Sequence, residues 1–274
     1  MKRGSYEDAS FLQSAFNNQD AVLFALSVKA TDHQAKLIEA AARANVKWIL
    51  PNEYAGDGMN ESMVDGSPLF QPKREARKLI EKLAQRYTGL RWIAVATNPW
   101  VENSIHFGLL GLNPTEKTAK IATDSGNFNL STLNRVGEGI SRLLSLPVTN
   151  PEHPRASLQH YANNFLYLSS FSTSQWEAFK SVQRATGTTE KEWKVESDNI
   201  AERIRKDKDL MATGGEGAFH AVYDLLCAYY IGKGLGGDYQ SKAVEDLKVL
   251  GLAEEDQIEV FRRAIETGPP KLPF

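Results

Sequence analysis

The chain has 274 residues, of which 42% are hydrophobic and 24% charged, and its formal net charge at pH 7 is −2. This balance is typical of a soluble globular protein with one large domain or two closely joined ones. The basic residues are scattered along the chain, which argues against nucleic acid or an anionic membrane as a partner. The single cysteine, Cys227, excludes an intramolecular disulfide and a CxxC metal site, so no metal is expected and a reducing compartment is favoured.

The termini and the apolar windows carry no targeting or membrane signal. The N-terminus has two basic residues with no apolar segment after them, unlike a secretory signal. The most apolar long window, residues 218–231, is too short to span a bilayer and contains Asp224. The sequence therefore predicts a cytoplasmic protein.

The first hundred residues alternate between helical and strand patterns. Residues 10–16 space their apolar side chains at helical intervals, with Ser10 as a candidate N-cap. Short apolar runs predict strands buried on both faces, and longer amphipathic stretches predict the helices between them. The expected strands are 22–28, 47–51 and 91–96, and the expected helices are 33–44 and 73–87. This alternation predicts an α/β fold with a parallel sheet and right-handed crossovers.

The later part of the chain is less periodic. Strands are expected at 117–122 and 165–171, and helices within 136–146, 175–186, 197–207 and 257–266. Prolines at 147, 151 and 154 mark the expected seam between the two parts of the chain. The predicted division is a parallel-sheet core at residues 1–147 and a smaller, closely integrated α/β substrate-binding lobe at residues 148–274.

Polar residues follow each of the three predicted strands of the core. The strand ends are Ser27-Val28, Pro51-Asn52-Glu53-Tyr54 and Thr97-Asn98-Pro99. In an open parallel sheet, ligands bind outside the C-terminal ends of the strands. An ordinary solvated loop would explain any one of these ends, but three in succession favour a shared ligand cleft.

Several motifs occur in the order expected of one known family. They are GSYED at 4–8, Gln34-x-x-Leu37-Ile38-x-Ala40-Ala41, VKWILPNEYAGD at 46–57, KREARKLIE at 73–81 and TNPWVEN at 97–103. This series resembles the isoflavone-reductase-like and NmrA-like group of atypical short-chain dehydrogenases. The group's V-K-R-F-h-P-S-E-F-G has Ser, Phe and Gly where this chain has Asn52, Tyr54 and Ala55. The resemblance implies an NAD(P)-binding Rossmann-like fold and an oxidoreductase.

The resemblance also implies a role for each strand end. The chain would reduce a small aromatic or carbonyl-bearing metabolite with NADPH, NADH not being excluded, and Lys73 would be the general base or proton relay. From spacing alone, Lys73 would be an ordinary solvated lysine of a helix. The implied cofactor-binding residues are Ser27, Val28, Pro51, Asn52, Glu53, Tyr54, Lys73, Thr97, Asn98 and Pro99. The implied substrate-binding residues are Trp100, Asn103 and His106, although a lone loop histidine is more often structural.

The family's glycine-rich turn has no counterpart near the start of this sequence. Such a turn holds the cofactor pyrophosphate with backbone N–H groups. The only dense glycines are GKGLGG at 232–237, far downstream. The sequence therefore looks truncated at its N-terminus, and weak NADPH binding is expected. Two other interpretations stay open: an NmrA-like dinucleotide sensor that acts through a regulatory protein partner, and a degenerate fragment that binds nothing. A monomer and a homodimer are both compatible with the sequence.

Overall fold

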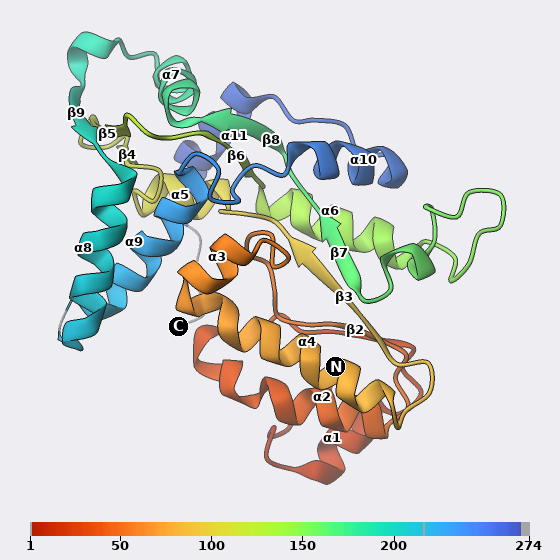
Figure 1. Cartoon of the computed structure of the whole chain (residues 1–274). Coiled ribbons are helices and arrows are strands. Elements are labelled where there is room, and N and C mark those ends of the chain that lie inside the picture. Colours follow the sequence, from red (N-terminus) through yellow and green to blue (C-terminus); the bar gives the residue numbers. More distant parts are fainter. Residues whose placement is uncertain (1, 216, 270–274) are drawn as a thin grey trace.

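A parallel four-stranded sheet forms the centre of the computed structural model, which describes residues 2–215 and 217–269. Its order is β1-β2-β3-β7, and the strands are β1 (Ala21–Leu23), β2 (Trp48–Leu50), β3 (Arg91–Ala96) and β7 (Asn164–Tyr167) (Figure 1). Ile49 of β2 is in register with Val22 on one side and Trp92 on the other, and Ala94 is in register with Phe165. The predicted α/β fold with a Rossmann-like parallel sheet is confirmed.

Helices cover both faces of this sheet. On one face, α1 (Ala9–Phe16), α2 (Gln34–Arg43) and α4 (Gln71–Ala84) bury apolar residues against Ile49, Trp92 and Ala94. On the other, α6 (Leu133–Leu144) and α10 (Gln240–Leu250) pack against Leu50 and Ile93. Successive strand residues therefore point to opposite cores, which explains why the strands are apolar throughout.

Most of the other elements build a separate core beside the central sheet, the second core. Its strands are β4 (Leu112–Asn113), β5 (Thr118–Ala122) and β9 (Lys194–Asp198) in one sheet, and β6 (Asn127–Leu130) with β8 (Phe171–Ser174) in another. Its helices are α5 (Val101–His106), α7 (Gln175–Thr186), α8 (Ile200–Thr213), α9 (Ala218–Ile231) and α11 (Gln257–Thr267), while α3 (Glu61–Gly66) lies between the cores. Within the described residues, none of the helices is long and apolar enough to cross a membrane.

The predicted division at residue 147 does not coincide with the division between the central sheet and the second core. The strand β7, which follows the seam, belongs to the central sheet, and residues 101–130, which precede it, pack in the second core. The division into residues 1–147 and 148–274 stays a prediction.

Several predicted elements have other limits in the structure, among them two strands and the first helix. β1 ends at Leu23 instead of 28, because the Asn52 N–H donates to the Gln34 side chain (2.7 Å) and the Leu26 N–H donates to the Asn52 side chain (3.1 Å), so no backbone ladder continues there. Residue Val28 therefore begins a 3₁₀ helix, η1 (Val28–His33). The run 165–171 forms parts of two strands, because Leu168 bonds to β3 whereas Ser170 bonds to β6.

The cap of the first helix lies two residues earlier than predicted. Asp8, not Ser10, accepts the backbone N–H groups of Ser10 and Phe11, and α1 begins at Ala9. A carboxylate satisfies two free donors at once, which makes it the stronger cap here.

A buried carboxylate joins α10 to the central sheet. Asp246 accepts the backbone N–H of Tyr167 at 2.8 Å and the hydroxyl of Tyr161 at 3.1 Å. Burial of Asp246 raises its pKa to about 6, although both hydrogen bonds oppose the shift. The folded protein therefore holds this proton more tightly than the unfolded chain does.

The raised pKa of Asp246 makes stability depend on pH. Because the folded pKa lies above the unfolded value of 3.8, this group's contribution to the unfolding free energy falls as pH rises between those values. The expected loss is on the order of 2–3 kcal/mol. Asp246→Asn should remove it, since the amide can accept from Tyr167 and donate to Tyr161. Urea unfolding of both proteins across this pH range would measure the difference, and parallel pH curves would contradict the assignment.

Candidate functional site

The C-terminal ends of β1, β2 and β3 lie together at one edge of the sheet. Asn52 joins the first two, because its backbone N–H donates to Gln34 of α2 (2.7 Å) and its side chain accepts from Leu26. The segment after β2 then runs beside β3, where the Ala55 carbonyl accepts the N–H groups of Thr97 (2.8 Å) and Asn98 (3.0 Å). The structure therefore brings two of the predicted strand ends into direct contact and places the third beside them.

Lys73 reaches this edge from the first turn of α4. Its amine donates to the backbone carbonyl of Asn52 at 2.8 Å and also to that of Glu53. Burial lowers the pKa of Lys73 and the nearby Arg77 adds to the shift, while the Glu53 carboxylate opposes it. The lysine is thus part of the strand-end cluster rather than of the solvated face of α4, and its neutral form is more accessible than that of a surface lysine.

A buried ion pair supports Lys73 from the next turn of α4. Arg77 contacts the carboxylate of Glu53, and both side chains are almost completely buried. Its guanidinium also donates to the carbonyl of Gly58 (3.2 Å) and lies over the ring of Phe165, 5.0 Å from its centroid. Sequence analysis assigned no role to Arg77. Its spacing of four residues from Lys73, which puts both cations on one helix face, is the signal that could have found it.

Two residues at the strand ends have an unusual backbone conformation. Tyr54 and Asn98 lie in the left-handed region, with φ of 42° and 52°. The hydroxyl of Tyr54, one carboxylate oxygen of Glu53 and the amide oxygen of Asn98 are buried and have no hydrogen-bond partner among the described residues. Burial, with the adjacent Glu53 charge, also raises the pKa of Tyr54. Strained backbone and unpaired buried oxygens tend to concentrate at functional sites.

The downstream glycine segment packs onto the end of β3. The carbonyl of Gly237 accepts the side chain of Asn98 (2.6 Å) and the backbone N–H of Asn129 (2.9 Å). A side chain at Gly237 would collide with the backbone of Tyr230, and Gly236 has a φ of 108°. Sequence analysis treated these glycines as remote from the site. Their density was a signal of close backbone packing, although nothing local indicated where they pack.

The three predicted substrate residues lie in different surroundings. The Trp100 indole donates to Thr97 (3.2 Å), so this side chain stays at the strand end. The Asn103 amide oxygen is buried without a partner among the described residues. The His106 ring lies 2.8 Å from the carbonyl of Ala264 in α11, a contact between two helices of the second core.

The other predicted cofactor residues line the same edge or its approach. Pro51, Thr97 and Pro99 are buried, and Ser27 is half-buried at the start of η1. Of the Val28 side chain no placement is described. The described residues contain no group of three or more His, Cys, Asp or Glu side chains that could hold a metal ion.

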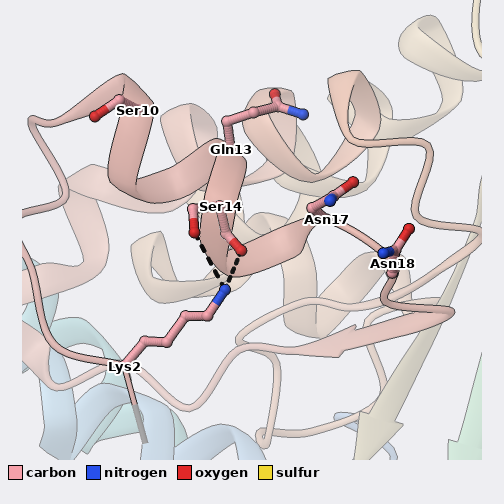
Figure 2. Close-up of a pocket in the computed structure, with 6 residues that line it drawn as sticks. All are labelled: Lys2, Ser10, Gln13, Ser14, Asn17 and Asn18. Carbon is pink, nitrogen blue, oxygen red and sulfur yellow. Dashed lines mark hydrogen bonds between the residues drawn. The ribbon is translucent and has the colours of Figure 1, made fainter.

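A polar hollow on the surface of α1 is separate from the strand ends. Figure 2 shows Lys2, whose amine donates to Ser14, facing this helix across the hollow. The remaining lining residues are Ser10, Gln13, Asn17 and Asn18. None of the predicted site residues lines it, so it plays no part in the candidate site.

Known families and proteins resemble this chain in sequence and in fold. Residues 2–103, which contain β1 to β3 and the Lys73 helix, match the NmrA-like family. The predicted resemblance is confirmed. The chain is 26% identical to the oxidoreductase aprR of Aspergillus flavus over 249 residues, and this aligned region covers 90% of this chain and 77% of that protein.

Solved structures of reductases share the fold of this chain. An isoflavone reductase superposes with a TM-score of 0.70 at 17% identity, covering 95% of this chain and 80% of that one. The triphenylmethane reductase of Citrobacter sp., complexed with NADP(H), has a TM-score of 0.63 at 17% identity and covers 95% and 82%. An NADPH-dependent quinone oxidoreductase of Escherichia coli, complexed with NADPH, has a TM-score of 0.64 at 14% identity and covers 96% and 82%.

Proposed function

We propose that the chain is an NAD(P)H-dependent oxidoreductase of the isoflavone-reductase-like type, which reduces a small aromatic or carbonyl-bearing metabolite in the cytoplasm. The observation that carries the proposal is the Lys73 amine, held at the C-terminal edge of the sheet beside the buried Glu53–Arg77 pair. This edge is where open α/β sheets bind ligands. NADPH is the preferred cofactor, because the matching structures include complexes with NADP(H) and NADPH.

The chemistry of the strand ends suits the nicotinamide half of such a cofactor. The unpaired oxygens of Glu53, Tyr54 and Asn98 are hydrogen-bond acceptors, which complement the hydroxyl and amide donors of a nicotinamide nucleoside. The bound nicotinamide would supply the hydride. The chain itself would orient the ring, exclude water and supply a proton at the reacting atom.

Lys73 is the residue proposed to move that proton. Partial burial makes its amine a better match for proton transfer near neutral pH than a surface lysine, since an acid is most effective when its pKa approaches the working pH. Trp100 and Asn103, next along the chain from β3, are proposed to border the substrate. Cys227 is not part of this chemistry, because burial raises its pKa to about 12.

The proposal is tested by NADPH titration followed by turnover. Because the sequence has no GxxGxxG turn, we expect calorimetry to give weak affinity, several powers of ten below that of an anchored dinucleotide. Turnover of quinone and triphenylmethane dye substrates is therefore measured at saturating NADPH, from the absorbance of the reduced nicotinamide. Low-micromolar affinity would show that the missing turn is unimportant, and no NADPH-dependent reduction of any substrate would contradict the enzyme function.

A regulatory function is the second candidate. Its supporting observation is that the Lys73 amine already bonds to two backbone carbonyls, a use that shapes the loop and needs no proton transfer. A dinucleotide sensor acting through a protein partner would bind NADPH without turnover. The same titration and assay therefore distinguish the two functions.

A further inference from the structure

We propose that Asp57, Tyr167 and Lys242 form a positioning unit, the Asp57 clasp, that holds the loop after β2 and thereby sets the surroundings of the Lys73 amine. The inference rests on the proposed function only in that Lys73 is the proton donor there. The three residues come from the loop after β2, from β7 and from α10. Asp57 ends the VKWILPNEYAGD motif, but sequence analysis assigned a role to none of the three.

The contacts of the clasp converge on one buried carboxylate. Asp57 is 5% exposed, and one of its oxygens accepts the Tyr167 hydroxyl at 3.0 Å and the backbone N–H of Met59 at 2.9 Å. The other oxygen accepts the Lys242 amine at 2.7 Å. Lys242 also donates to the Tyr167 hydroxyl (3.2 Å) and lies 4.6 Å from the centroid of its ring. A buried carboxylate is stable only with such compensation, so the contacts of Tyr167 and Lys242 hold Asp57, and with it the loop, in its buried position.

The clasp and Lys73 act on the same short loop. Lys73 bonds to the carbonyls of Asn52 and Glu53 at the start of the loop. Arg77 joins the two ends, since it contacts the Glu53 carboxylate and donates to the carbonyl of Gly58, the residue after Asp57. Movement of Asp57 is therefore transmitted through Gly58 and Arg77 to the groups that surround the lysine amine.

There is little room for the loop to absorb such a movement locally. Gly58 lies close to Phe165 of β7 and Arg77 of α4. A Cβ added at Gly58 would be 2.6 Å from the Phe165 ring and 3.0 Å from the Arg77 guanidinium. Tyr54, within the loop, already has a left-handed backbone. The loop is thus held at both ends and packed in its middle, which makes the clasp a support for the site rather than an isolated surface contact.

Loss of the clasp should change the proton affinity of Lys73 in a defined direction. The charged groups that face Lys73 are Glu53 from the loop and Arg77 from its own helix, and desolvation is the largest influence on its pKa. A loosened loop admits water to the amine, which favours its charged form and raises the pKa. A merely structural contact on α10 would leave this value unchanged.

The test measures the pKa of Lys73 in the full chain without cofactor or substrate. Trace labelling of amines with acetic anhydride across pH, read by peptide mass spectrometry, gives the pKa of each lysine. We expect Tyr167→Phe, which changes no charge, and Lys242→Met to raise the pKa of Lys73 enough to lower its reactivity at neutral pH by about fivefold to tenfold. Lys242→Arg should restore the wild-type value at least in part.

The matched control is Lys248→Met, which removes a lysine charge from the exposed face of the same helix. It should leave the pKa of Lys73 unchanged. An unchanged pKa of Lys73 in both clasp variants, or an equal shift in Lys248→Met and Lys242→Met, would overturn the inference. The proposed function is tested separately by turnover: if the wild-type chain shows no NADPH-dependent reduction, or Lys73→Ala has no effect on it, while the clasp variants still shift the pKa, the function or the role of Lys73 in it fails and the positioning unit stands.

Discussion

Replacing Lys73 with alanine is expected to lower NADPH-dependent turnover by about 10²-fold or more while changing dinucleotide affinity little. The lost contribution is proton transfer, which acts in the transition state and not in cofactor binding. The partly buried amine, bonded at 2.8 Å to the Asn52 carbonyl, is the group proposed to transfer the proton. Steady-state kinetics at saturating NADPH would measure the effect, and calorimetry would measure the affinity.

A neighbouring lysine provides the control for this variant. Lys78 lies on the same helix, but its side chain is 59% exposed and pairs with Glu75 at the surface. Lys78→Ala should therefore retain wild-type turnover. Equal turnover of the Lys73→Ala and wild-type proteins would contradict the proton-transfer role and would assign Lys73 to shaping the loop alone.

Replacing Arg77 with alanine is expected to lower the free energy of unfolding by roughly 3–5 kcal/mol, the largest stability effect that we expect of a single substitution at the site. The variant leaves the Glu53 carboxylate, 3% exposed, without its charge partner. It also removes the guanidinium from the Phe165 ring and from the Gly58 carbonyl. Urea denaturation followed by circular dichroism would measure the change.

Two further variants separate the buried charge from other causes. Arg74→Ala removes an arginine of the same helix that pairs with Asp65 at the surface (3.2 Å), and it should cost less than about 1 kcal/mol. Adding Glu53→Gln to Arg77→Ala should recover part of the stability, because a neutral amide is less costly to bury than a carboxylate. A loss in Arg77→Ala no larger than that in Arg74→Ala would show that the Glu53 charge is compensated by other groups.

Local patterns were sufficient where a segment carries its own boundaries. The helix predicted at 175–186 is observed as α7 (Gln175–Thr186), where Ser174 and Glu177 form a capping box and Gly187 ends the helix with a φ of 66°. The strand predicted at 91–96 is observed as β3, because its residues are buried on both faces of the central sheet. The helix is delimited by its own capping residues, and the strand is apolar along its length because almost all of it is buried.

The site itself was only partly predictable. The ordered motifs placed Lys73 and Asn52 at the strand ends, and the structure joins them by a hydrogen bond. The limits of β1 were not predictable, since they depend on which residues of β2 stand opposite. A strand pattern reports that a residue is buried but does not identify its hydrogen-bonding partner.

The sequence by itself determined the alternation of strands and helices, the family resemblance and the polar strand ends. Only the tertiary structure decided which distant residues complete the site: Gly237 on the side chain of Asn98, and Lys242 on the carboxylate of Asp57, 185 residues away in the chain. Periodicity and caps arise from contacts a few residues apart, so they can be read along the chain. A buried carboxylate instead requires a compensating partner without specifying where in the chain that partner lies, and the packing of α10 against β7 supplies it.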